Sequence, residues 1–258
     1  MRILLTNDDG ILAPGLEALY RALRDLGQIE VVAPETPQSA VGHAISVLTP
    51  MPAHRVSVRN LFEGWGVDGR PADCVKLALL ELLPWRPDFV VSGINAGANT
   101  GINILYSGTV AGAAEGAFFG VPSLAVSLEL SDKLDFERAA AIARQIFDRY
   151  VAAQPPPGTC LNVNIPALDA RESGWPKGVR VCPQGVVPMN DRYHKHIDPR
   201  GRPVFYLDGA MPERGACPDS DLEAIADGYV AITPLKFDVT DRALLPVVEG
   251  WNWPQRFP

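Results

Sequence analysis

Several features are scarce or missing in this sequence, and each absence excludes a class of protein. The 258 residues include four cysteines, none in a Cys-x-x-Cys pair, so neither a zinc knuckle nor a thioredoxin-like site is indicated and the thiols are expected to be reduced. No apolar run approaches the roughly 18 residues that a transmembrane helix needs. The start of the chain, Met1 to Asp9, turns polar too soon for a secretory signal peptide, so we expect a cytoplasmic protein.

Positive charge is also in deficit. The 23 Lys and Arg residues stand against 30 Asp and Glu, a net charge of −7, and such a surface repels nucleic acid and anionic lipid on average. We therefore expect no stable nucleic-acid partner and no membrane association. An anionic substrate would need a local reversal of this field, for which a bound metal ion is the obvious candidate.

What the sequence does contain is an alternation of strand and helix patterns. Apolar runs predict strands over residues 2–6, 29–33, 89–91, 123–128 and 161–165, with weaker signals around 181, 204–207 and 229–233. Helical spacing predicts helices over residues 16–26, 73–83, 109–119 and 136–150. The third of these helices consists of small residues, which we attribute to close packing on a sheet.

This alternation predicts an α/β fold of the Rossmann-like three-layer α/β/α type, with a mostly parallel sheet. The pattern loosens after the three prolines at 155–157. We therefore expect one domain, with a catalytic core over about 1–167 and 228–235. Residues from about 168 to 227 and from 236 to 258 would form a hairpin and a tail that serve as a C-terminal extension for oligomerisation.

Oxygen-bearing side chains follow three of the predicted strands, where parallel sheets bind their ligands. Asp8 and Asp9 are adjacent carboxylates, and each raises the pKa of the other unless a hard divalent cation relieves the repulsion. Ser39 follows the second strand, and Asn95 and Asn99 follow the third in a glycine-rich segment. Singly, these residues also fit a solvated turn or an ordinary loop. Together they make an all-oxygen set that suits Mg²⁺ or Mn²⁺.

A phosphate-binding turn is indicated where the small-residue helix begins. Ser107, Gly108 and Thr109 would offer hydroxyls and free N–H groups at a helix N-terminus, although the same residues also make an ordinary N-cap. The glycine-rich segment before them is neither a dinucleotide-binding fingerprint nor a P-loop. A cation site beside a phosphate cradle points to metal-assisted phosphoryl chemistry.

Six motifs also carry a family resemblance. They are Thr6 to Gly10, Gly69 to Val75, Ser92 to Asn95, Tyr106 to Val110, Leu161 to Pro166 and Gly228 to Leu235. In this order, over nearly the whole chain, they resemble the survival protein SurE family of metal-dependent 5′-nucleotidases. The resemblance implies a phosphoric monoester hydrolase that acts on nucleoside monophosphates, with 3′-nucleotides and short polyphosphates as further candidate substrates.

The resemblance also assigns residues to roles. It implies one divalent cation per subunit, Mg²⁺ or Mn²⁺, with Asp8, Asp9, Ser39 and Asn95 as ligands. Catalytic roles would fall to Asp8, Asp9 and Asn95, and the phosphate-binding turn to Ser107, Gly108 and Thr109. Asn99 is a further candidate for substrate binding. The chain departs from the family at residues 40–44, where His43 could contact phosphate or base, and at Arg70, where Thr is common.

Other interpretations remain beside this one. The one cationic island, residues 192–202, is either a solvated hairpin or an arm that reaches a neighbour's active site. The resemblance implies a hairpin that helps to build a homodimer or homotetramer. A zinc deacetylase would need histidines that are missing here, and a haloacid-dehalogenase phosphatase would need carboxylates spaced Asp-x-Asp. A non-catalytic nucleotide-binding subunit that serves as a stress-response scaffold is the alternative function.

Overall fold

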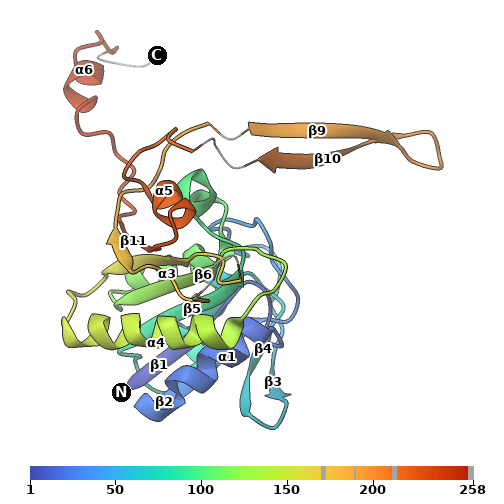
Figure 1. The fold of residues 1–258 in the computed structure, drawn as a ribbon, viewed down its shortest axis with the longest axis vertical. Helices are drawn as coiled ribbons and strands as arrows, with labels where there is room; N and C mark the ends of the chain where they lie inside the picture. Colours follow the sequence, from blue (N-terminus) through green and yellow to red (C-terminus); the bar gives the residue numbers. More distant parts are fainter. Residues whose placement is uncertain (170–172, 189, 211–213, 255–258) are drawn as a thin grey trace.

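A nine-stranded sheet forms the centre of the computed structural model, which describes residues 1–169, 173–188, 190–210 and 214–254 (Figure 1). The strands of this sheet are β1 (Arg2–Thr6), β2 (Gln28–Pro34), β3 (Ala53–Val58), β4 (Phe62–Val67), β5 (Phe89–Ala96), β6 (Ser123–Leu128), β7 (Cys160–Ile165), β8 (Val179–Val181) and β11 (Val230–Leu235). Their order across the sheet is β3-β4-β2-β1-β5-β6-β7-β11-β8. The predicted α/β class with a mostly parallel sheet is confirmed.

The central strands set the place where a ligand can bind. β1 pairs in parallel with β2 on one side and β5 on the other, and β6 and β7 continue the parallel arrangement. The chain therefore leaves β1 in one direction and later returns to its opposite side. Parallel sheets bind ligands at such a reversal, beyond the carboxyl ends of the strands. The antiparallel pairs, β3 with β4 and β11 with β7, lie farther out.

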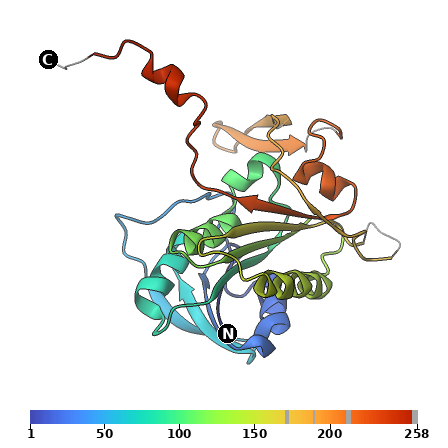
Figure 2. The same cartoon turned by 90° about the vertical axis from the view of Figure 1, so that its left-hand side faces the viewer.

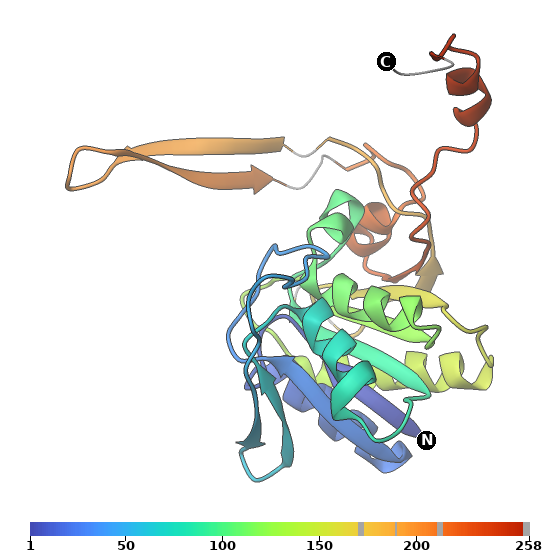
Figure 3. The same ribbon diagram turned by 180° about the vertical axis from the view of Figure 1, so that it is seen from behind.

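Helices cover both faces of the sheet. α1 (Pro14–Leu23) and α4 (Phe136–Ala152) pack against each other on one face, and α2 (Pro71–Leu77) and α3 (Gly108–Phe118) pack together on the other (Figures 1 and 3). The small residues of α3 do reflect close packing. A Cβ added at Gly112 would come within 2.9 Å of Thr6 Cγ2, and one at Gly116 within 2.6 Å of Ser123 Oγ.

Some elements lie outside the sequence-based expectations. The hairpin β3–β4 and the short helices α5 (Asp221–Ala226) and α6 (Leu245–Glu249) were not predicted. The predicted first helix ends in a separate turn, η1 (Arg24–Leu26), and the second continues as the π-helix η2 (Ala78–Leu82). A further short turn, η3 (Gly101–Leu105), precedes α3. The strand predicted over 89–91 extends to residue 96.

The C-terminal part of the chain supplies the expected hairpin. β9 (Asn190–Ile197) and β10 (Pro203–Ala210) form a two-stranded sheet that projects from the body, and α6 stands away from it (Figures 1 and 2). β8, from the segment predicted as extension, joins the main sheet beside β11. The division into core and extension stays a prediction, and residues 170–172, 189, 211–213 and 255–258 of the predicted extension lie outside the described part of the chain. Among the helices described, none is long and apolar enough to cross a membrane.

Candidate active site

Asp8 lies just beyond β1 and is 6% exposed. One of its oxygens, Oδ1, accepts a hydrogen bond from the hydroxyl of Thr109, which is fully buried. Burial raises the pKa of Asp8 from 3.8 to about 6; the Thr109 hydrogen bond opposes this rise, and the Asp9 carboxylate adds to it. The carboxylate is therefore held in a place that disfavours its own charge.

The Asp9 side chain reaches from the end of β1 to the end of β5, where Asn95 lies. The Ala96 N–H donates to Asp9 Oδ2 at 3.1 Å, which ties Asp9 to the residue after Asn95. The pairing of β5 with β6 shifts register between Ser92 and Asn95, so the end of β5 departs from regular strand geometry. The Asn95 amide donates from Nδ2 to the Gly97 carbonyl at 2.7 Å, which leaves Oδ1 as the free oxygen acceptor of this side chain.

Ser39 is carried by a long connection between β2 and β3, residues 35–52, which we call the Ser39 loop. It has no regular secondary structure, and Ser39 itself is exposed. The Gln38 N–H donates to the Asp8 carbonyl at 2.7 Å, and the Gly42 N–H donates to the Tyr106 carbonyl at 2.8 Å. These two bonds bring the Ser39 loop to Asp8 on one side and to the start of α3 on the other.

The N-terminus of α3 lies directly against Asp8. Ser107 is the N-cap residue, and its Oγ accepts from the Val110 N–H at 3.1 Å. A Cβ added at Gly108 would come within 2.8 Å of Asp8 Cβ and 3.0 Å of Asp8 Oδ2, so only glycine permits this approach. The first N–H groups of a helix have no partner within the helix and are suited to bind an anion. The arrangement places such a cradle beside the carboxylates.

The negative charges of Asp8 and Asp9 fit a hard divalent cation. Within the described part of the chain, no Lys, Arg or His side chain forms an ion pair with Asp8 or Asp9. The hydroxyls of Thr6 and Ser92 and Oδ1 of Asn7 are buried there without a hydrogen-bond partner among these residues. Two uncompensated carboxylates with neutral oxygens nearby form the kind of donor set that Mg²⁺ or Mn²⁺ accepts.

This set differs from the usual clusters of metal-binding side chains. Among the residues that the structure describes, no group of three or more His, Cys, Asp or Glu side chains could hold a metal ion. The set at β1 and β5 instead has two carboxylates, and its other oxygens come from Ser and Asn side chains. The predicted ligands Asp8, Asp9 and Asn95 are brought together, and the Ser39 loop is held against them by main-chain bonds. Their role as ligands stays a prediction.

Two predicted substrate-binding residues have other partners in the structure. The Asn99 side chain donates from Nδ2 to Ser127 Oγ at 2.8 Å, and its main-chain N–H donates to Asn164 Oδ1 at 2.7 Å, so it belongs to a buried network at β6 and β7. His43 lies 2.7 Å from Glu115, two turns along α3 from the cradle. Their contact with substrate stays a prediction.

Sequence reasoning missed the residues that anchor the Ser39 loop. Glu115 is 3% exposed and contacts His43, while Asp73 accepts from both the N–H and the hydroxyl of Ser46 at 2.8 Å. A signal was available for Glu115, because it is the single charged residue in helix α3. A lone carboxylate in a buried helix needs a partner, and that partner is a candidate for a site residue.

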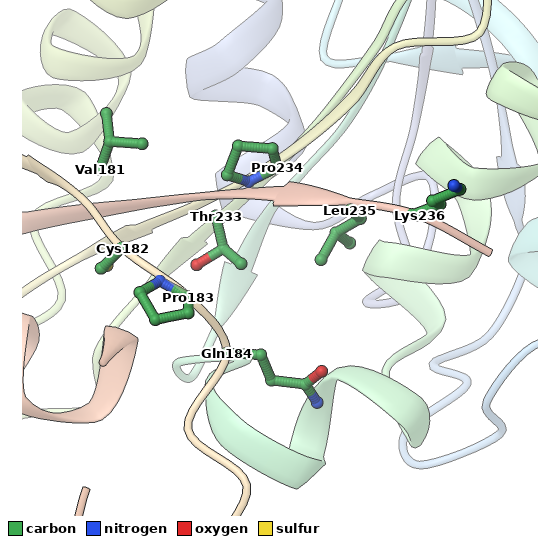
Figure 4. Close-up of a pocket in the computed structure, with 8 residues that line it drawn as sticks. All are labelled: Val181, Cys182, Pro183, Gln184, Thr233, Pro234, Leu235 and Lys236. Atoms are coloured by element: carbon green, nitrogen blue, oxygen red, sulfur yellow. The ribbon is translucent and has the colours of Figure 1, made fainter. Parts of the chain in front are cut away.

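One pocket of the structure differs in chemistry from the candidate site. A depression of about 470 Å³ lies between β8 and β11, and is lined by residues such as Cys182, Thr233 and Lys236 (Figure 4). Its lining residues include no carboxylate. Burial raises the pKa of the Cys182 thiol, so this sulfur is a poor nucleophile. β5, β6 and β7 separate this pocket from β1, and nothing in its lining indicates phosphoryl chemistry.

Comparisons with known proteins agree with one another. The sequence model of a family described as Survival protein SurE matches residues 3–191. A 5′-nucleotidase SurE from Rhodopirellula baltica is 48% identical over 98% of this chain and 99% of the relative, and one from Syntrophobacter fumaroxidans is 45% identical over 98% and 100%. The crystal structure of a SurE protein from Aquifex aeolicus superposes with a TM-score of 0.80 at 38% identity, and covers 96% of this chain and 98% of that one.

Proposed function

Because the chain belongs to the survival protein SurE family, we propose that it is a metal-dependent 5′-nucleotidase, which hydrolyses nucleoside monophosphates to a nucleoside and inorganic phosphate. The relatives named 5′-nucleotidase support this reaction. The single observation that carries it in this chain is the contact between Asp8 and the N-terminus of α3. There a buried carboxylate without a cationic partner among the described residues lies beside a helix N-terminus, a place that favours anions.

We further propose one divalent cation per subunit, Mg²⁺ or Mn²⁺, held by Asp8, Asp9, Ser39 and Asn95. The donor set supports this, because all four side chains offer oxygen and the carboxylates have no cationic partner among the described residues. When bound, such a cation supplies positive charge at the phosphoryl oxygens and lowers the pKa of a coordinated water.

The residues of the chain do the positioning. The Thr109 hydroxyl holds Asp8 by its Oδ1, so the other oxygen, Oδ2, faces Gly108 and the space in front of α3. The Val110 and Ala111 N–H groups already bond to Ser107, so the phosphate oxygens would be bound at Ser107, Gly108 and Thr109, where the chain enters α3. Phosphoryl transfer passes through a loose transition state, so correct placement and charge stabilisation supply most of the acceleration.

Phosphate release from AMP and GMP tests this function. We expect turnover with Mn²⁺ or Mg²⁺, none with EDTA, and recovery when the cation is restored in excess. The 3′-monophosphates and short polyphosphates, assayed in parallel, define the specificity of the phosphoric monoester hydrolase. Nucleotide binding without turnover under all these conditions would instead support a non-catalytic stress-response scaffold.

We also propose an oligomeric state and a cellular location for the protein. The chain would work as a homodimer or homotetramer built with the β9–β10 hairpin, whose side chains are largely exposed. The four cysteines are free, with Cys74, Cys160 and Cys182 buried, which suits a reducing compartment, and we propose the cytoplasm. The net charge of −7 argues against a stable nucleic-acid partner, and a small phosphorylated substrate would rely on the proposed cation.

A further inference from the structure

The Ser39 loop needs anchors, because it spans residues 35–52 without a helix or strand of its own. Main-chain bonds from Gln38 and Gly42 hold it near Asp8 and Tyr106, each at a single point. Figure 3 shows the loop, in blue, beside the start of α3. Ser39 itself is exposed, so packing does not fix its hydroxyl, and its position depends on the anchors on either side.

His43 is the side chain by which the loop contacts the body of α3. Its Nε2 lies 2.7 Å from Glu115 Oε2. Its ring stacks on Phe118, with ring centroids 5.0 Å apart and planes inclined by 8°. The stack fixes the plane of the imidazole and the carboxylate fixes its direction, so together they determine where residue 43 of the loop lies.

Glu115 is well placed to act as this anchor. It is 3% exposed, and its Oε1 lies 2.6 Å from Lys76 Nζ of α2. Burial raises the pKa of Glu115, but the hydrogen bonds and charges of His43 and Lys76 outweigh burial and bring the pKa below its ordinary value. Glu115 is thus a buried carboxylate with one oxygen on the loop and the other on a neighbouring helix.

We propose that Glu115 is a positioning residue of the nucleotidase site, which acts through His43 to fix the Ser39 loop and so hold the Ser39 hydroxyl beside Asp8 and Asp9. This inference rests on the proposed function, because it takes Ser39 as part of the cation site. The phosphate cradle opens α3, and Glu115 follows Gly108 by seven residues on the same helix, about 10 Å along its axis. One rigid helix therefore sets the spacing between the cradle and the anchor of the loop.

If Glu115 only stabilises the packing of the helices, its substitution should have different effects. A buried carboxylate with two cationic or donor partners stabilises the packing of α2 on α3, and its loss would lower the melting temperature. Loss of the Glu115 carboxylate would then leave the hydrogen exchange of the Ser39 loop and the affinity for a cation unchanged. The two roles are therefore separated by measurements on the loop and on the cation, and thermal stability alone does not distinguish them.

The test uses the full chain with the substitutions Glu115→Met, which has no group that could hydrogen-bond His43 well, and His43→Phe. The second keeps a ring that can stack on Phe118 and removes only the bond to Glu115. Hydrogen exchange of peptides covering residues 38–46 reports the loop without any metal. Titration with Mn²⁺ alone, followed by the electron paramagnetic resonance of the free ion, reports the cation site.

We expect faster exchange of the Gln38 and Gly42 amides in both variants, and Mn²⁺ binding weakened by about 10–100-fold, as for other residues that orient metal ligands. The double variant should bind Mn²⁺ no more weakly than either single variant, because both remove the same contact. The matched control is Lys76→Met, which removes the other partner of Glu115 and leaves the loop contact intact. It should change Mn²⁺ affinity by less than about twofold while lowering the melting temperature.

The positioning role would be overturned if Glu115→Met and His43→Phe keep wild-type hydrogen exchange and Mn²⁺ affinity and show only a lower melting temperature. Equal loss of affinity in Lys76→Met would do the same. The proposed function is judged separately, by Mn²⁺ binding and AMP hydrolysis in the wild type. If the wild type binds no Mn²⁺, loop exchange alone decides: faster exchange in the variants supports the anchor, and unchanged exchange refutes it.

Discussion

At the scale of single residues, Asp8 shows most clearly how the site is built at the expense of stability. Its folded-state pKa of about 6 lies above its ordinary 3.8, so the native chain takes up a proton at a higher pH than the unfolded chain. Ionised Asp8 therefore destabilises the native state, and this loss of stability develops as the pH rises from about 4 to above 6. A difference of about two pH units corresponds to as much as about 3 kcal/mol.

The substitution Asp8→Asn should therefore separate stability from activity. We expect it to abolish phosphate release from AMP with Mn²⁺ and to raise the melting temperature of the protein in EDTA. The gain in stability should be large at pH 8, where wild-type Asp8 is charged in the native state, and small at pH 4, near the ordinary pKa of the carboxyl group, where the loss has barely begun to develop. The measurement is thermal unfolding at both pH values, with phosphate release assayed on the same preparations.

Asp132→Asn is the matched control, because it removes the same charge from an exposed residue. It should leave both activity and the difference between the two pH values unchanged. Undiminished turnover in Asp8→Asn would refute the assignment of the active site. An equal stability gain at pH 4 and pH 8 would show that burial of the charge is not what destabilises the native state.

At the scale of elements, the site depends on how closely α3 approaches the end of β1. Gly108→Ala would place a methyl group 2.8 Å from Asp8 Cβ and 3.1 Å from Pro71 Cγ, so the start of the helix must move away. Because misplacement by about 1 Å can cost 100-fold in rate, we expect kcat/KM for AMP to fall by about 100-fold. Gly250→Ala is the control, since its Cβ would meet its nearest neighbour at an ordinary 3.4 Å. Wild-type kinetics in Gly108→Ala would show that the cradle does not need this contact.

Local pattern was enough to predict the central elements and the carboxylates. Asp8 and Asp9 could be found because they directly follow a short buried run, and parallel strands end at one edge of the sheet. The hairpin β3–β4 could not be found, because β3 is largely exposed and β4 contains Gly64 and Gly66. β4 is a strand because it pairs with β2, and a Cβ at Gly64 would come within 2.9 Å of the Val31 carbonyl.

The anchor of the Ser39 loop lay beyond sequence reasoning for a related reason. His43 and Glu115 are 72 residues apart, and only the packing of the loop on α3 brings them within hydrogen-bond distance. From the sequence, His43 is a candidate for contact with phosphate or base, because residues 40–44 depart from the family pattern directly after Ser39. Contacts between distant segments depend on tertiary structure, and local periodicity carries no information about them.

At the scale of the whole molecule, the β9–β10 hairpin has two different faces. Side chains of directly opposite residues lie on the same face, so Tyr193 and Leu207 share one face, and His194 and Tyr206 share the other. Tyr193 is 69% exposed and Leu207 is 61% exposed. A two-stranded hairpin is marginally stable alone in water. A second copy that covers the face of Tyr193 and Leu207 would remove this apolar surface from water.

We therefore expect that the paired substitutions Tyr193→Lys and Leu207→Glu at least halve the mass of the assembly, measured by light scattering after size-exclusion chromatography. Lys and Glu face each other across the strands and should attract, so the hairpin itself keeps a favourable pair while the surface becomes charged. The control introduces the same two residues on the other face, as His194→Lys and Tyr206→Glu, and should leave the mass unchanged. An unchanged mass in the first variant, or a halved mass only in the control, would show that the face of Tyr193 and Leu207 is not the one that joins two subunits.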